Sequence, residues 1–201
     1  MLDGTIRPKI DPALNALARL FVRAGLTANM VTTLGLLIGL LAALAIVFQL
    51  YWLGLALLLV SRICDGVDGA VARINGKSDF GGYIDIVFDF IFYGVIPLAF
   101  IIADPTANAV AGGVLIFAFY ANGASFLAFA IMAEKHGLTT DQRGEKSIFF
   151  TTGLAEATET IAVFVAFCLF PSYFAPIAYL FAVVCFYTTA VRIWQTKQLI
   201  G

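Results

Sequence analysis

The sequence predicts an all-α membrane protein with six transmembrane helices, preceded by an amphipathic helix at the membrane surface. Hydrophobic residues make up 61% of the chain and charged residues only 12%, whereas a soluble domain carries about 25% charged residues. Six apolar stretches each approach the roughly 20 residues that a helix needs to cross the hydrocarbon of a bilayer. The basic residues are distributed around these stretches in a one-sided pattern.

The first predicted element is an amphipathic helix over about residues 12–23. Leu14 and Phe21 lie on one of its faces, and basic side chains lie on another. Such a helix can lie in the headgroup layer of a membrane, and a soluble N-terminal arm is the alternative. We therefore divide the chain into an interfacial segment, residues 1–28, and a transmembrane domain, residues 29–201.

The six predicted membrane helices follow, and Thr27 or Asn29 can cap the first of them. Their approximate ranges are 29–49, 50–72, 81–103, 107–132, 147–170 and 173–195. All twelve Lys and Arg residues are assigned to one side of this arrangement, with Arg62 at the inner end of the second span. The positive-inside rule makes that side cytoplasmic. We therefore expect an integral protein of a bacterial-type inner membrane, with both termini in the cytoplasm.

Four aspartates form two stripes on the second and third predicted membrane helices. Asp65 and Asp68 are three residues apart, and Asp85 and Asp89 are four apart, so each pair lies on one face of its helix. Both stripes start from the cytoplasmic side, so the four acids can meet in a cavity open to the cytoplasm. Ionisable groups at membrane depth are costly and indicate function. We expect no base inside the spans to balance them, which leaves divalent cations such as Mg²⁺ or Mn²⁺.

The same stretch resembles the signature of the CDP-alcohol phosphotransferase family. That signature reads Asp-x2-Asp-Gly-x2-Ala-Arg, then seven or eight residues, then Gly-x3-Asp-x3-Asp. Its fixed positions are filled here by Asp65, Asp68, Gly69, Ala72, Arg73, Gly81, Asp85 and Asp89. The resemblance implies a phospholipid-synthesis enzyme that transfers a phosphatidyl group from a CDP-linked donor, such as CDP-diacylglycerol, to the hydroxyl of an acceptor alcohol and releases CMP.

The resemblance also implies roles for the matched residues. Asp65, Asp68, Asp85 and Asp89 would hold two divalent ions, and Asp89 would act as general base on the attacking hydroxyl. The residues expected near the CDP moiety of the donor are Asn29, Gly69, Ala72, Arg73, Ser78 and Gly81. Ala28 stands where relatives have proline before the asparagine. Because relatives form homodimers, a homodimer is expected here.

Candidate residues for the acceptor alcohol are less specific in pattern. Glu156 and Glu159 lie three apart inside the fifth predicted span, and intramembrane acids again suggest a site. Arg143, Lys146 and Arg192 could bind an acceptor phosphate. The acids could instead form a structural polar network, and the bases could simply follow the positive-inside pattern.

The residue after the fourth aspartate leaves the acceptor open. It is Phe90 here, whereas relatives that use glycerophosphate tend to have Lys and those that use inositol phosphate tend to have Arg.

A divalent-cation transporter is the alternative function, although the aspartate stripes are not repeated elsewhere, as a transporter built from repeats would require. Nothing in a net charge of -1 predicts a nucleic-acid partner.

Overall fold

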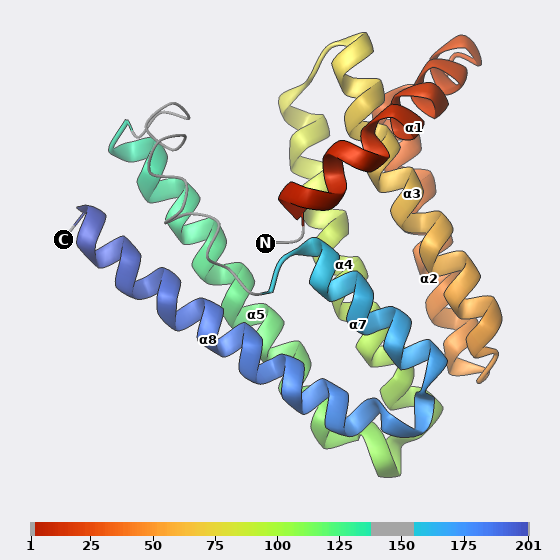
Figure 1. The fold of residues 1–201 in the computed structure, drawn as a ribbon, viewed down its shortest axis with the longest axis vertical. Coiled ribbons are helices and arrows are strands. Elements are labelled where there is room, and N and C mark those ends of the chain that lie inside the picture. Colours follow the sequence, from red (N-terminus) through yellow and green to blue (C-terminus); the bar gives the residue numbers. More distant parts are fainter. Residues whose placement is uncertain (1–2, 138–154, 201) are drawn as a thin grey trace.

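The computed structural model describes residues 3–137 and 155–200, and this part of the chain is helical (Figure 1). Its helices are α1 Asp3–Arg23, α2 Ala28–Val47, α3 Tyr51–Asn75, α4 Asp79–Ala103, α5 Pro105–Lys135, α7 Ala157–Leu169 and α8 Phe174–Ile200, with a 3-10 turn, η2 Pro171–Tyr173, before α8. The predicted all-α class is therefore confirmed.

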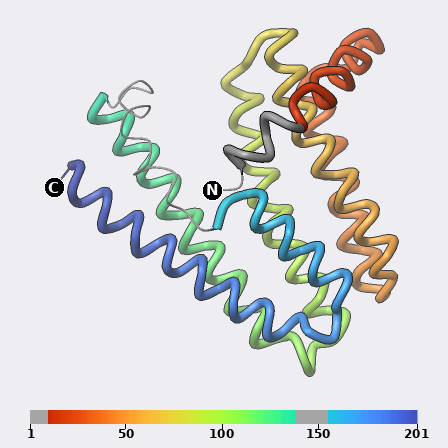
Figure 2. The backbone as a smooth tube through the Cα atoms, in the orientation of Figure 1, coloured from red at the N-terminus to blue at the C-terminus, as the bar shows by residue number. Residues whose placement is uncertain are grey.

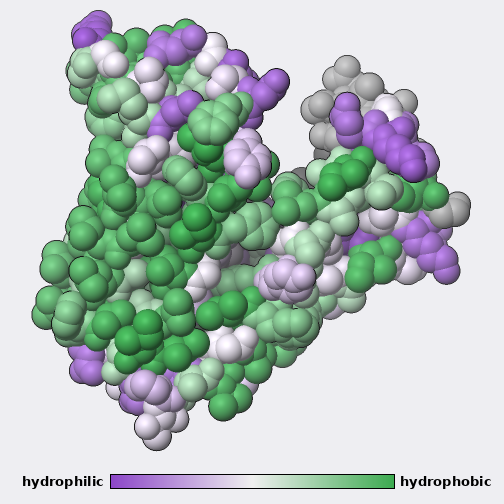
Figure 3. Space-filling view, turned by 180° about the vertical axis from the view of Figure 1, so that it is seen from behind, coloured by the Kyte–Doolittle hydropathy of each residue, from purple (hydrophilic) through white to green (hydrophobic). Residues whose placement is uncertain are grey.

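Four of the described helical segments are long and apolar enough to cross a membrane: α2, α4, α5 and the segment that combines η2 with α8. The 25-residue α3 has the length but contains charged side chains, Arg62 among them. Figure 3 shows hydrophobic side chains over most of the middle of the surface, with hydrophilic ones gathered mainly toward its ends. These features fit an integral membrane protein.

The fifth predicted span differs most from expectation. Its described helix, α7, has only 13 residues and begins at Ala157, so it is roughly 20 Å long at 1.5 Å per residue. The hydrocarbon core of a bilayer is about 30 Å thick. Glu156 is the N-cap residue of α7 and has an extended backbone. Residues 147–154 of the predicted span lie outside the described residues.

The helices form two groups that spread apart toward one end. In one group α2 packs against α3 and α4, and in the other α5 packs against α8, while α4 also contacts α5. Figures 1 and 2 show the two groups close together at the lower end and separated at the upper end. At the lower end the Gln49 side chain donates from Nε2 to the carbonyl of Ala103 at 3.0 Å. Asn108 Nδ2 donates to the carbonyl of Phe100 at 2.9 Å, which ties α5 to α4 there.

Helix α1 lies across the upper end of the first group and packs on α3 (Figure 1). Ala18 is fully buried in this contact, and the Leu14 side chain lies against Gly66, where a Cβ atom would be 3.1 Å from it. Arg73 Nη2 donates to Asn15 Oδ1 at 3.4 Å. The expected N-terminal helix is present and longer than predicted, and part of its apolar face rests on protein.

Side-chain caps fix the helix starts at the upper end. Thr27 Oγ1 accepts a hydrogen bond from the Met30 amide at 3.3 Å and begins α2, as one of the two predicted capping residues. Ser78 Oγ accepts from the Gly81 amide at 3.0 Å and begins α4. Between α3 and α4, Gly76 has a φ of 97°, a left-handed conformation that favours glycine. The two aspartate-bearing helices are therefore joined by a tight, capped turn.

An aromatic core joins α4, α7 and α8 below this end. Its phenylalanines are fully buried: Phe92, Phe100, Phe164, Phe167 and Phe174. The rings of Phe167 and Phe174 lie 4.5 Å apart between centroids, and those of Phe100 and Phe174 lie 4.9 Å apart. Buried aromatic side chains contribute large contact areas with fixed geometry, so this core holds the short α7 against α4.

The close packing of α2 on α4 gives a stability test at Gly39. A Cβ atom there would lie 2.7 Å from the Phe92 ring and 3.1 Å from Ser61 Oγ. We expect Gly39→Ala to lower the free energy of unfolding by about 1–3 kcal/mol through overpacking. Gly113→Ala is the matched control, because nothing lies within 4 Å of a Cβ atom at that helical glycine. Thermal unfolding of purified protein in detergent tests this, and equal melting temperatures for the two variants would contradict it.

Candidate active site

Three of the four predicted metal-binding aspartates meet between α3 and α4. Asp65, Asp68 and Asp85 each offer a carboxylate oxygen, and these three oxygens all lie within 4.8 Å of one another. Asp68 is only 6% exposed, and its Oδ2 is buried without a hydrogen-bond partner in the described part of the chain. A divalent cation bound by oxygen ligands would satisfy that atom and offset the mutual repulsion of the carboxylates. The residues present therefore fit Mg²⁺ or Mn²⁺.

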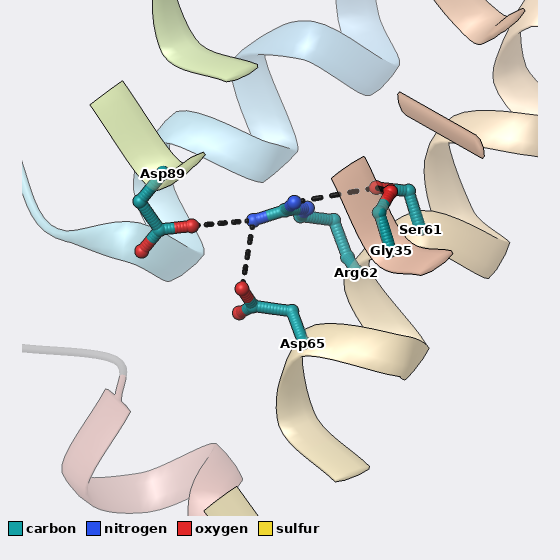
Figure 4. A network of polar contacts seen from close by, with 5 residues as sticks. All are labelled: Gly35, Ser61, Arg62, Asp65 and Asp89. Atoms are coloured by element: carbon teal, nitrogen blue, oxygen red, sulfur yellow. Dashed lines mark hydrogen bonds and ion pairs between the residues drawn. The ribbon is translucent and has the colours of Figure 1, made fainter. Parts of the chain in front are cut away.

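The fourth aspartate, Asp89, faces a buried arginine (Figure 4). Arg62 Nη1 donates to Asp89 Oδ1 at 2.9 Å and lies 3.3 Å from Asp65 Oδ1. One nitrogen thus bridges a carboxylate of α3 and one of α4. The expectation that no base inside the spans balances these acids was wrong, and so was the placement of Arg62 at the inner end of its span, because Arg62 lies near the middle of α3.

The Arg62 side chain is held from several directions. It is 8% exposed, and its guanidinium carbon lies 3.6 Å from the centroid of the Phe92 ring, within the range of a cation–π interaction. Its Nη2 donates to Ser61 Oγ at 3.2 Å, and Ser61 Oγ donates in turn to the Gly35 carbonyl on α2 at 2.7 Å. The cation is therefore fixed between α2, α3 and α4.

The predicted donor-binding residues lie at the upper ends of α2, α3 and α4. A Cβ atom on Gly81 would be 2.9 Å from both Asn29 Oδ1 and Ser78 Oγ, so these three residues adjoin one another. Beside Gly69 the nearest atom to an added Cβ would be Arg73 Nη1 at 3.8 Å, which leaves room for a ligand. Ala72 precedes Arg73 on the same helix and is half-buried.

A cavity of about 760 Å³ lies between α4, α5, α8 and the start of α7. Its lining includes Asp89, so it reaches the acid cluster, and it also includes Glu156 and Arg192. Much of the remaining lining is aromatic, with Phe90, Tyr93, Phe119, Tyr120, Phe126 and Phe129. Of the other candidate acceptor residues, Glu159 lies in the first turn of α7 and not in this lining. Arg143 and Lys146 lie outside the described residues.

The Arg192 side chain connects α8 to α5. Its Nη1 donates to the Asn122 carbonyl at 2.9 Å, to Asn122 Oδ1 at 2.8 Å and to Ser125 Oγ at 2.6 Å. Sequence reasoning missed Asn122 and Ser125, although two polar residues three apart inside an apolar span are a signal of buried hydrogen bonding. Arg192 therefore has a structural role at the cavity wall, whatever it binds.

The aromatic residue after the fourth aspartate also packs on α5. The Phe90 ring occupies the space where a side chain at Gly123 would lie, and both residues line the cavity. The chain therefore presents an apolar ring at the cavity wall beside Asp89.

The described helices thus form a bundle of the membrane-protein type, with clustered carboxylates that fit a divalent cation and a cavity beside them. A sequence profile of the CDP-alcohol phosphatidyltransferase family matches residues 25–195, and the chain belongs to this family. The inner membrane protein YnjF of Escherichia coli K12 is 43% identical over 195 residues, which cover 97% of this chain and 95% of that protein. Archaetidylinositol phosphate synthase of Pyrococcus horikoshii is 39% identical over 85 residues, or 42% of this chain and 45% of that protein.

Solved structures with a similar fold come from phosphatidylinositol phosphate synthase of Mycobacterium tuberculosis. The structure with CDP-DAG bound has a TM-score of 0.72 at 21% identity and covers 91% of this chain and 92% of that one. The structure in complex with manganese and citrate has a TM-score of 0.69 at 22% identity and covers 91% and 88%. At these identities the likeness establishes the fold.

The contact between Arg192 and Asn122 gives a prediction about stability. Asn122→Ala removes a side-chain acceptor from a half-buried cation, and we expect a loss of about 1–3 kcal/mol in the free energy of unfolding. Asn75→Ala, at an exposed asparagine, is the control and should change stability by less than about 0.5 kcal/mol. Denaturation followed in detergent distinguishes them, and an Asn122→Ala variant as stable as the control would show that the contact contributes nothing.

Proposed function

We propose that the protein transfers a phosphatidyl group from a CDP-diacylglycerol-type donor to the hydroxyl of an acceptor alcohol, with release of CMP, in phospholipid biosynthesis. The observation that carries this proposal is the cluster of Asp65, Asp68 and Asp85 with Asp89 beside it, in a chain of this family. The bound CDP-DAG in the M. tuberculosis enzyme supports the choice of donor.

The four aspartates are proposed to hold Mg²⁺ or Mn²⁺. When the CDP-linked donor is bound, two such ions are present. The M. tuberculosis complex with manganese supports this choice of metal. When bound, divalent ions would neutralise the donor diphosphate and stabilise the charge that develops during phosphoryl transfer. Three of the ligands already lie within 4.8 Å of one another, so little rearrangement of these side chains is required.

Asp89 is proposed to be the general base, because it touches both parts of the site. It belongs to the acid stripe of α4 and it also lines the cavity that an acceptor would enter. The acceptor hydroxyl passes its proton to the Asp89 carboxylate. The oxygen of that hydroxyl forms a new bond to the phosphorus that carries the diacylglycerol. The bond from this phosphorus to the CMP oxygen breaks, and CMP leaves.

The donor nucleotide is proposed to bind at the upper ends of α2, α3 and α4. Gly69 and Ala72 leave space for the cytidine, and Arg73 would pair with the phosphates through its planar guanidinium. The proposed site also includes Ser78 and Gly81 at the start of α4 and Asn29 at the start of α2, which adjoin one another around Gly81.

The acceptor is proposed to occupy the cavity between α4, α5 and α8. Glu156 and Arg192 are the candidate polar contacts there, and Glu159, at the start of α7, is a candidate just outside the lining. Arg143 and Lys146 remain candidates from the sequence. The largely apolar lining, which includes six aromatic side chains, supports an acceptor with a substantial apolar part.

The arrangement in the membrane is part of the proposal. Both termini and the acid cluster face the cytoplasm, as the distribution of basic residues indicates. Residues 1–28 form the interfacial segment, residues 29–201 form the transmembrane domain, and two chains associate as in relatives.

The reaction can be tested directly with purified protein and CDP-diacylglycerol. With Mg²⁺ or Mn²⁺ and a panel of alcohols, we expect CMP to appear with at least one acceptor. The panel should include glycerol 3-phosphate, inositol, inositol 1-phosphate, serine and phosphatidylglycerol. We expect Asp89→Asn to reduce kcat on the order of 100-fold or more, since it removes the base. Asp79→Asn, at an exposed acid on the same helix, should leave kcat within about twofold. Metal flux into vesicles without CMP release from any alcohol would favour the transporter.

A second variant tests where the donor binds. Gly69→Val adds bulk where nothing but Arg73 Nη1 lies within 4 Å, so the fold should tolerate it while the nucleotide loses space. We expect KM for CDP-diacylglycerol to rise on the order of tenfold, equivalent to about 1.4 kcal/mol, with a small change in kcat. Gly113→Val is the control for a valine in an open helical position. An unchanged KM in Gly69→Val would place the nucleotide elsewhere.

A further inference from the structure

The Arg62 guanidinium lies where a second cation of the acid cluster would otherwise be expected. Its Nη1 is 2.9 Å from Asp89 Oδ1 and 3.3 Å from Asp65 Oδ1, and so bridges two carboxylates from different helices. Asp65 also belongs, with Asp68 and Asp85, to the group of carboxylates that can share one ion. The four acids therefore face one fixed organic cation and one site for a metal, and Asp65 is common to both.

Formal charges follow the same division. Four carboxylates carry four negative charges, and one divalent ion together with Arg62 offsets three of them. A second divalent ion would turn the remaining single negative charge into a single positive one, so the acids and Arg62 alone gain no charge balance from it. The diphosphate of a CDP-linked donor brings at least two further negative charges, which a second ion would balance.

The structure also fixes Arg62 in place. The guanidinium stacks on Phe92, which is fully buried, and the hydrogen bonds through Ser61 reach the backbone of α2 at Gly35. A side chain that is 8% exposed and held on two sides cannot leave readily when a metal ion approaches. Its positive charge is a permanent part of the site.

We propose that Arg62 serves as the resident counter-ion of Asp89, so that the chain alone binds one divalent ion and takes up a second only together with the donor diphosphate. Arg62 is a positioning residue in this scheme, acting through Asp89. The proposal rests on the proposed function for the identity of the diphosphate ligand, whereas the count of ions in the free protein does not depend on any catalytic activity.

Manganese binding to the purified chain tests this without turnover. The electron paramagnetic resonance signal of free Mn²⁺ is followed during titration, first with Mn²⁺ alone and then with CDP as a soluble source of the diphosphate. We expect about one bound ion per chain without CDP and about two with it. Arg62→Met should bind about two ions without CDP, because Asp89 becomes available as a ligand. Arg62→Lys keeps the charge and should remain at one.

Two further variants make the outcome decisive. Adding Asp89→Asn to Arg62→Met should return the count to one ion, and Asp89→Asn alone should bind one ion without CDP and gain none with it. If Arg62→Met does not fold, the Asp89→Asn variant and the unmodified chain carry the test. Two ions on the unmodified chain without CDP, or loss of the first ion in Asp89→Asn, would overturn the proposal. Failure of CMP release with these ion counts intact would count against the proposed reaction alone.

Discussion

The structure depends on the balance of charge around four carboxylates inside a helical membrane bundle. In an environment of low polarity, like charges repel strongly and each ionised group loses its hydration. Arg62 meets part of this requirement by bridging Asp65 and Asp89. The unpaired oxygen of Asp68, close to Asp65 and Asp85, leaves a place for a metal ion. Site and fold are inseparable here, because the same ion pair that neutralises Asp89 also joins α3 to α4.

The scaffold supports this balance with small residues and large rings. Glycines on α2 let α3 and α4 approach closely, and a side chain at Gly39 in particular would collide with both Phe92 and Ser61. Those two side chains are the platform and the hydrogen-bond partner of the Arg62 guanidinium. The packing of this core therefore also orients the Arg62 guanidinium in the site. The aromatic cluster connects the same core to α7 and α8.

Much of the fold and the centre of the site could be predicted from the sequence, because both depend on short-range periodicity. Residues three or four apart share a helix face, so the aspartate spacing placed Asp65 with Asp68 without knowledge of the tertiary structure. The pairing of Arg62 with the acids was not predicted, because Arg62 also fits the positive-inside pattern. It nevertheless lies three residues before Asp65, on the same face of the helix. A search for opposite charges at helical spacing would have found the pair.

Other features could not be predicted because they join distant parts of the chain. The hydrogen bond from Arg192 to Asn122 spans 70 residues, and no local pattern pairs the two. The start of α7 at Ala157 could not be predicted either, because Thr and Glu residues interrupt the apolar stretch without marking a helix boundary. The extended backbone of Glu156 sets that boundary in the structure.

The Gln49 hydrogen bond to Ala103 carries a consequence for how the molecule accommodates ligands. It fastens the turns at the end of the bundle farthest from the acids, where α4 also meets α5 through Asn108. With that end tied together, the pair α5 and α8 is separated from the first group only toward the opposite end (Figure 1). The candidate metal ligands belong to α3 and α4, whereas the cavity wall opposite Asp89 belongs to α5 and α8, so the ion site and most of that wall are supplied by different helix pairs.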